Sequence, residues 1–246
     1  MTAIKRWLIE RLPDRQRTRW RYWYRALTRR LDRELAYTRR LLRPGSGVAD
    51  VGANAGLYTY AFGRTVSVDA FEPLPEAARL LKALATALPR VRVHEVALSD
   101  CAGAATLYVP HIRGVPFTEL ARFSPVQGPH HTAVVAVRTL DEYDLHHIGL
   151  IKIDVEGHER QVISGAAHTI EREKPMLLVE IEQRHGSADI TETFHAITGL
   201  GYRGYFIDGH GRRHPIADFR YERDQEPYIE RPTDVRYVNN FLFIHE

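Results

Sequence analysis

Short apolar runs alternate with amphipathic stretches along the chain, which is the pattern of an α/β domain built on a mostly parallel sheet. The amphipathic stretches predict helices at about 75–88, 159–173 and 189–200. The polar, proline-bearing segment 208–235 is predicted to be an excursion from the sheet. The runs predicted to form strands are 47–52, 65–71, 91–98, the run around Lys152, 175–182, 202–207 and 237–244, with two extra strands at 104–109 and 132–137.

The first strand ends in a turn bracketed by Gly52 and Gly56, and a helical pattern follows at once. Such a turn presents backbone N–H groups to a ligand, although it lacks the full G-x-G-x-x-G form of a dinucleotide site. Asp50, two residues before the first glycine, would repel a pyrophosphate and attract an ammonium or a sulfonium. Because the helix start favours a carboxylate, the three groups together indicate S-adenosylmethionine (SAM). The alternative is a strand-to-helix turn without a ligand.

Two further acids follow predicted strands in the order expected of a nucleoside site. Glu72 comes about 20 residues after the turn and is predicted to accept hydrogen bonds from the ribose hydroxyls. Its alternative role is that of an acid at the start of the helix that Pro73 and Pro75 introduce. Asp100, after Ser99, is the predicted partner of the adenine amine, with a simple Ser-Asp turn as the alternative.

The strand around Lys152 carries polar residues at every second position, so Lys152, Asp154 and Glu156 share one side of it. A lysine in a central strand needs an anionic partner, because an unpaired buried ammonium costs several kcal/mol. Asp50 is the natural partner if the two strands are neighbours. Glu180 ends the following strand, so Asp154 and Glu180 are expected to face one pocket.

These acids also suggest how a hydroxyl acceptor would lose its proton during methyl transfer. A divalent ion such as Mg²⁺, held by Asp154 and Glu180, is one hypothesis. A general base is the other, supplied by Asp154, Glu156 or His158. The competing interpretation is structural: the acids hold Lys152 and cap the next helix. Asp154 is central in each case, and its role stays open at this stage.

The composition fits a protein of one α/β domain with an appendage. The chain has 246 residues, 44% of them hydrophobic and 26% charged. No apolar run approaches the roughly 18 residues of a membrane span, and the N-terminus lacks an apolar signal core. Cys101 is the single cysteine, which excludes an internal disulfide and fits a reducing compartment. A cytoplasmic location is therefore expected.

The formal charge divides the chain into two parts of opposite sign. Residues 1–43 hold 14 Lys and Arg against 4 Asp and Glu, a charge of +10, which leaves −7 for residues 44–246. A breaker cluster at 43–47 marks the boundary between a basic helical arm, 1–43, and the main domain, 44–246. The arm's interleaved Arg, Trp and Tyr suit an anionic membrane surface or phosphates. We favour packing on its own acidic domain or on a second subunit, as in a homo-oligomer, and no base-reading motif supports nucleic acid.

The length of the loop 110–131 predicts a lid or an acceptor pocket. Several ordered blocks of residues lie between about 47 and 182: Asp50 to Thr59, Phe71 to Pro75, Ala97 to Asp100, Thr139-Leu140-Asp141, Lys152 to Glu159, and Leu178 to Ile181. Together these blocks resemble the FkbM family of SAM-dependent methyltransferases. The resemblance implies the seven-stranded, Rossmann-like class I methyltransferase sheet with an antiparallel last strand, and methyl transfer to a hydroxyl of a sugar, glycan or natural product.

The resemblance also assigns ligand-binding roles by position. It implies that Asp50, Gly52, Asn54 and Gly56 surround the methionyl part of SAM, that Glu72 holds the ribose, and that Ser99 and Asp100 hold the adenine. Ala53, Tyr58 and Thr59 of the same stretch complete the predicted cofactor set. The arm and the chain after about 185 lie outside the resemblance, so the acceptor is not specified.

Overall fold

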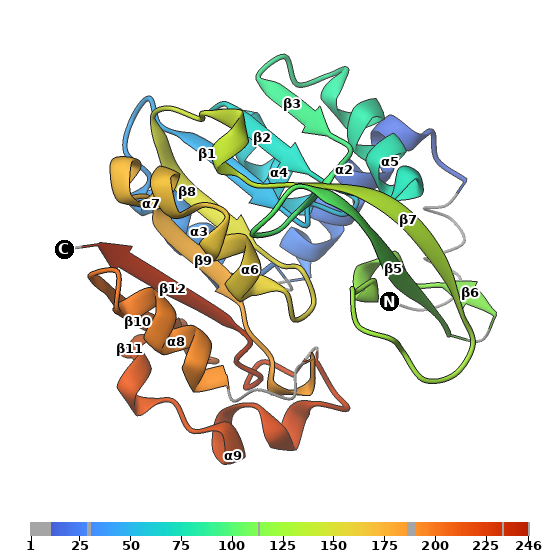
Figure 1. The fold of residues 1–246 in the computed structure, drawn as a ribbon. Helices are drawn as coiled ribbons and strands as arrows, with labels where there is room; N and C mark the ends of the chain where they lie inside the picture. Colours follow the sequence, from blue (N-terminus) through green and yellow to red (C-terminus); the bar gives the residue numbers. More distant parts are fainter. Residues whose placement is uncertain (1–10, 29–30, 113, 186–189, 233, 246) are drawn as a thin grey trace.

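The computed structural model describes residues 11–28, 31–112, 114–185, 190–232 and 234–245. Its centre is an eight-stranded sheet in the order β11-β10-β12-β9-β8-β1-β2-β3 (Figure 1). β1 pairs in parallel with β2 and β8, whereas β12 runs antiparallel to β9 and β10. The strands are β1 (Gly47–Val51), β2 (Val68–Phe71), β3 (Val91–His94), β8 (Ile148–Ile153), β9 (Met176–Glu180), β10 (Tyr202–Ile207), β11 (Arg213–Pro215) and β12 (Asn240–His245).

The predicted α/β class is confirmed, but the sheet has one strand more than the seven expected. The extra strand is β11, which lies antiparallel to β10 at the edge of the sheet. It comes from the polar segment 208–235, where the Asp208 N–H donates to the Arg212 carbonyl oxygen at 2.9 Å and closes a tight turn. β11 has only three residues, and its first and last side chains are exposed. It contains no apolar run, so hydrophobic periodicity could not predict this strand.

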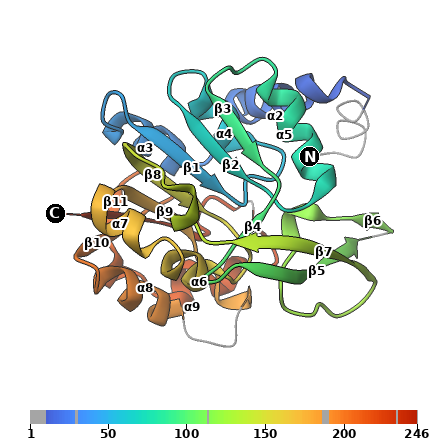
Figure 2. The same cartoon turned by 45° about the horizontal axis from the view of Figure 1, so that its top comes forward.

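Helices cover both faces of the sheet (Figures 1 and 2). One face carries α2 (Asp14–Leu27), α3 (Arg33–Leu41), α4 (Leu57–Gly63) and α5 (Pro75–Ala85), and the other carries α6 (Glu159–Ser164), α7 (Ala167–Glu173) and α8 (Ile190–Thr198). The short elements η3 (Gln183–His185), η4 (Ile216–Asp218), α9 (Tyr221–Asp224) and η5 (Glu226–Tyr228) complete the C-terminal part. Because both faces are covered, all five residues of β1 are buried.

The single helix predicted at 159–173 is two helices, α6 and α7. The break lies at Gly165, where a Cβ atom would come within 1.9 Å of the Ser99 carbonyl oxygen. The close approach of two backbones therefore requires glycine and interrupts the helix. The helix predicted from Asp189 begins at Ile190 in α8, and Asp189 itself lies outside the described residues.

A second sheet, β4-β7-β5-β6, branches from the first (Figure 2). The strand predicted at 91–98 is two strands, β3 and β4 (Ala97–Leu98). β3 pairs with β2, whereas β4 pairs with β7 of the second sheet. The two predicted extra strands are confirmed as the antiparallel pair β5 (Gly103–Ile112) and β7 (His130–Arg138). The loop between them contains β6 (Val115–Pro116) and η1 (Thr118–Leu120).

The described part of the basic arm packs on the main domain. In α2, the Tyr22 ring meets Tyr60 edge-on at 5.1 Å between centroids, and the Thr18 hydroxyl donates to the Ala55 carbonyl oxygen. Arg33 of α3 donates to the backbone carbonyls of Asp208 and Val235 at 2.8 and 2.7 Å. Residues 1–10 of the predicted arm lie outside the described residues. No helix in the described ranges is long and apolar enough to cross a membrane.

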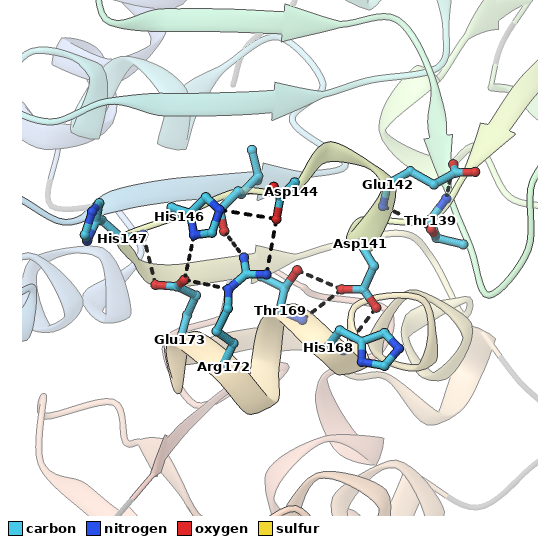
Figure 3. A network of polar contacts seen from close by, with 11 residues as sticks. Thr139, Asp141, Glu142, Asp144, His146, His147, His168, Thr169, Arg172 and Glu173 are labelled. Carbon is cyan, nitrogen blue, oxygen red and sulfur yellow. Dashed lines mark hydrogen bonds and ion pairs between the residues drawn. The ribbon is translucent and has the colours of Figure 1, made fainter.

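A polar network joins the segment before β8 to α7 (Figure 3). The Asp141 carboxylate, in η2 (Asp141–Tyr143), accepts the backbone N–H groups of His168 and Thr169 and the Thr169 hydroxyl at 2.7 to 3.0 Å. The carboxylate thus satisfies free donors in the first turn of α7. Farther along α7, Arg172 donates to the Leu145 carbonyl. The Thr139-Leu140-Asp141 block therefore has a structural role here.

Replacing Asp141 by Ala is expected to lower the free energy of unfolding by about 2 kcal/mol, because three donors lose a charged acceptor. Urea denaturation measures this change. SAM binding, measured by calorimetry at a temperature where the variant is folded, is expected to stay within about twofold of wild type. A weakened SAM affinity at unchanged stability would contradict the structural role.

Candidate active site

The site is built where the loop after β1 meets the end of β8. Gly52 has a φ of +73°, and a Cβ atom there would lie 1.8 Å from the Asp154 carbonyl oxygen. The Asp154 N–H donates to the Val51 carbonyl at 3.1 Å. A side chain at position 52 would push these two strand ends apart, so glycine is required by close approach as well as by its φ. The loop and Asp154 consequently form one wall.

The next residues of the loop are held by Glu72, at the end of β2. One Glu72 oxygen accepts the Asn54 N–H and the other accepts the Leu74 N–H, both at 2.8 Å. Burial raises the pKa of Glu72 to about 7 despite these two bonds, and the nearby Asp50 and Asp154 carboxylates add to the rise. The hydrogen bond from the Leu74 N–H, at the start of α5, also agrees with the alternative role of Glu72 as an acid at the start of this helix. Its contact with ribose stays a prediction.

Asp50 and Lys152 lie opposite each other on the neighbouring strands β1 and β8. Asp50 is 1% exposed, and the Thr59 hydroxyl donates to its carboxylate at 2.5 Å. Burial raises the pKa of Asp50, opposed by the Lys152 ammonium. The direct partner of Lys152 is Asp154, with 2.6 Å between Nζ and Oδ2, and not Asp50 as predicted. The Lys152 ammonium can reach Asp154 because Asp154 comes two residues later and shares the same side of the strand.

Lys152 is the cation within a group of buried acids. Burial opposes its charge, but Asp154, Glu180 and Asp50 outweigh this and raise its pKa. Glu180, at the end of β9, accepts a hydrogen bond from the Asn239 amide at 2.6 Å. Burial and the Asp154 carboxylate raise the pKa of Glu180 well above its usual value. The expected proximity of Asp154 and Glu180 is therefore met.

The predicted Mg²⁺ site is not supported by these contacts. Asp154 is bonded to the Lys152 ammonium, which would repel a metal ion at the same carboxylate. Glu180, with its raised pKa, is a poor anionic ligand. Among the described residues, no group of three or more His, Cys, Asp or Glu side chains is arranged to hold a metal. The two acids do not fit the ion, and no step is assigned to it.

Ser99, Asp100 and His158 form a second group of contacts, at the predicted adenine-binding residues. The Ser99 hydroxyl donates to Asp100 at 3.0 Å and lies 2.8 Å from His158 Nε2. The His158 ring also packs on Phe123, with 4.5 Å between the ring centroids. Burial lowers the pKa of His158, which favours the neutral ring. His158, a predicted base, thus contacts the predicted adenine-binding residues.

Tyr58, predicted to bind the cofactor, lies between the acid group and the arm. Its ring centroid is 5.2 Å from Lys152 Nζ, and burial followed by the Asp32 and Glu34 carboxylates raises the pKa of its phenol. Glu34 of α3 is itself buried, which raises its pKa to about 7. Tyr58 therefore connects the arm with the group of buried acids around Lys152.

Glu156, one of the predicted bases, has a φ of +56°, in the left-handed region.

Sequence reasoning did not predict three contacts, two at the glycine loop and one at His158. The Thr18 hydroxyl donates to the Ala55 carbonyl, the Thr118 hydroxyl lies 3.5 Å from the Asn54 amide, and the Phe123 ring packs on His158. The length of the loop 110–131 was a signal for the last two, but no local pattern indicates Thr18. The segment 117–123 therefore lies against the glycine loop at Asn54 and against His158, and its predicted role as a lid stays a prediction.

Comparison with known families shows which family the chain belongs to. Residues 50–206 match the family model described as the methyltransferase FkbM domain. The chain belongs to the FkbM methyltransferase family. The match begins at Asp50, the acid that precedes the glycine turn.

Two relatives of known description extend the match. The chain is 34% identical over 158 residues to 31-O-demethyl-FK506 methyltransferase FkbM of Streptomyces tacrolimicus, covering 50% of this chain and 60% of the relative. The crystal structure of methyltransferase FkbM from Methylobacillus flagellatus KT has a TM-score of 0.51 at 19% identity, over 97% of this chain and 57% of that one. The chain thus spans less than two thirds of either relative. The structural likeness supports the fold.

The residues on the loop suit SAM in kind. Asp50, Glu72 and Asp154 surround it with more carboxylates than Lys152 neutralises, which favours a ligand bearing a sulfonium and an ammonium. The individual contacts with Asp50, Gly52, Ala53, Asn54, Gly56, Thr59, Ser99 and Asp100 stay predictions.

The pKa of Glu72 predicts how SAM binding depends on pH. The ionised carboxylate offers two acceptors to a ribose diol, so binding favours the deprotonated form. With a pKa of about 7 in the free protein, affinity is expected to rise with pH and to be about tenfold weaker at pH 6 than at its alkaline limit. Calorimetry with S-adenosylhomocysteine between pH 6 and 8 measures this.

Glu72→Gln is the matched variant, because it keeps the shape and cannot titrate. The difference between the pH profiles of wild type and Glu72→Gln cancels the ionisation of the ligand. We expect the variant to bind more weakly, with a flatter profile. In the free protein, the raised pKa also means that stability falls as pH rises from about 4.5 to 7. Identical profiles for both proteins would refute the role of Glu72.

Proposed function

We propose that the protein methylates a hydroxyl group of a sugar, glycan or natural-product acceptor, with SAM as methyl donor. The relative named 31-O-demethyl-FK506 methyltransferase supports this, because that name describes transfer to an oxygen of a natural product. The segment 117–123, beside the glycine loop and His158, supports an acceptor pocket formed in part by the β5–β7 insertion. The cytoplasmic location expected from the sequence stays a prediction.

Asp154 is the proposed general base, and its contact with Lys152 is the observation that carries the proposal. The Asp154 side chain is 31% exposed, whereas that of Lys152 is 3% exposed, so the carboxylate can reach an acceptor. The Asp154 backbone packs on Gly52, at the end of the loop expected to hold the methionyl part. His158 is less suited, since it contacts Ser99 at the predicted adenine end.

The proposed chemistry is an in-line displacement at the methyl carbon. When bound, SAM would supply an activated methyl group, and the glycine loop would hold it. The acceptor hydroxyl would donate its hydrogen bond to Asp154, which takes the proton as the oxygen bonds the methyl carbon; the methyl–sulfur bond breaks, and its electron pair stays on the sulfur of S-adenosylhomocysteine. Lys152 holds the Asp154 carboxylate at 2.6 Å and so limits its rotation. The buried surroundings of Asp50 and Glu72 exclude water from the donor.

Asp154→Asn is expected to lower kcat about a hundredfold or more, because a general base contributes 10²–10⁴. SAM affinity is expected to fall much less than kcat, by less than about tenfold, because the amide keeps the shape of the side chain and the Asp50 and Glu72 carboxyl groups remain. Single-turnover transfer of labelled methyl groups to glycan, lipid and natural-product extracts, together with calorimetry, measures both quantities.

Glu156→Gln and His158→Asn are the comparison variants, because each removes a rival base. Both are expected to retain kcat within about tenfold, and chelator is expected to have no effect. Loss of SAM binding and of stability in Asp154→Asn at unchanged kcat would show that Asp154 only holds Lys152. Label transferred to nucleic acid alone would replace the proposed acceptor class.

A further inference from the structure

Helix α2 has a buried face and an opposite face that is unusually apolar. Thr18 and Tyr22 point into the domain and are 1% and 7% exposed. At roughly 100° per residue, Trp20, Trp23 and Leu27 fall within about 60° of one another on the other side of the helix. They are 57%, 43% and 82% exposed, respectively. Because the inner face is already used in packing, this stripe is available to a partner.

An exposed arginine of α2 flanks the apolar stripe. At roughly 100° per residue, Arg19 lies about 40° beyond Trp23. The guanidinium of Arg64, at the end of α4, lies 5.8 Å from the centroid of the Trp23 ring. Trp and Leu side chains surrounded by guanidinium groups are the composition of helices that lie in the interface of an anionic bilayer.

We propose that the outer face of α2 docks this protein on an anionic lipid surface. The charge of +10 on residues 1–43 attracts acidic headgroups, whereas the −7 on residues 44–246 is repelled, so the charge division orients the molecule with the arm toward the lipid. Trp20, Trp23 and Leu27 then enter the headgroup region, and the inner face of α2 stays packed on α4 and α5.

The observations favour lipid over two other occupants. A second copy of the chain would bring another arm of charge +10 against the first, which opposes self-association through this face. A nucleic acid would use the arginines and stack on tryptophan, but it gains nothing from Leu27, the most exposed of the three apolar side chains. A lipid surface uses both kinds of side chain.

The test is binding of the full chain to vesicles of phosphatidylcholine with and without phosphatidylglycerol, measured by cosedimentation and by the shift of tryptophan emission. We expect binding to the anionic vesicles, weakened by added salt. Trp20→Ser combined with Leu27→Ser is expected to lower the partition coefficient about tenfold or more. Arg19→Gln is expected to lower it about fivefold. These side chains are exposed, so the variants are expected to fold, and thermal denaturation checks this.

Val134→Ser and Arg138→Gln are the matched controls, because both side chains are exposed on β7, away from α2. They are expected to bind vesicles like wild type. Three results would overturn the proposal: no binding to anionic vesicles, equal binding by the α2 variants, or binding of the same face to RNA or DNA in preference to vesicles. A dimer in sedimentation that the Trp20 and Leu27 substitutions dissociate would assign the face to a second copy.

Discussion

The site depends on a shortage of positive charge among buried acids. The parallel register of β1 and β8 sets Asp50 opposite Lys152, and β9 adds Glu180 beside them. One ammonium cannot neutralise these carboxylates and Glu72 together, and the raised pKa values of Asp50, Glu72 and Glu180 are the consequence of burial and mutual repulsion. A ligand that brings a sulfonium and an ammonium would relieve this repulsion, and this favours SAM over a dinucleotide as the predicted ligand of these strand ends.

The described part of the basic arm contacts the glycine loop and the residues beside Lys152, so it packs as part of the domain. Thr18 supports the glycine loop through the Ala55 carbonyl, and Glu34 lies buried near Tyr58, which in turn faces Lys152. Helices α2 and α3 thus close the side of the loop that faces away from the predicted ligand. This packing uses the inner faces of the two helices, so their arginines remain largely at the surface.

Local pattern was sufficient where an element depends mainly on its own residues. The bounds of β10 were predicted to the residue, and β1 to within one. It failed where a distant contact decides the outcome. Gly165 breaks a predicted helix because the Ser99 backbone lies against it, β4 leaves β3 because β7 offers it a partner, and β11 exists because Asp208 closes its turn onto β10. None of these contacts leaves a periodic signal in the residues concerned.

The same limit applies to the roles of the acids and of His158. Residue types and strand ends were enough to select Asp50, Glu72 and Asp154, because carboxyl ends of parallel strands meet at one edge. The alternation in Lys152, Asp154 and Glu156 could not tell whether Lys152 binds Asp50 or Asp154, since both lie within reach of a lysine. His158 follows Asp154 closely in sequence, yet it bonds Ser99, 59 residues away, because the turn at Gly165 brings Ser99 beside α6. The two candidate bases are close in sequence but have different partners: Asp154 contacts Lys152, and His158 contacts Ser99. This difference favours Asp154 as the base.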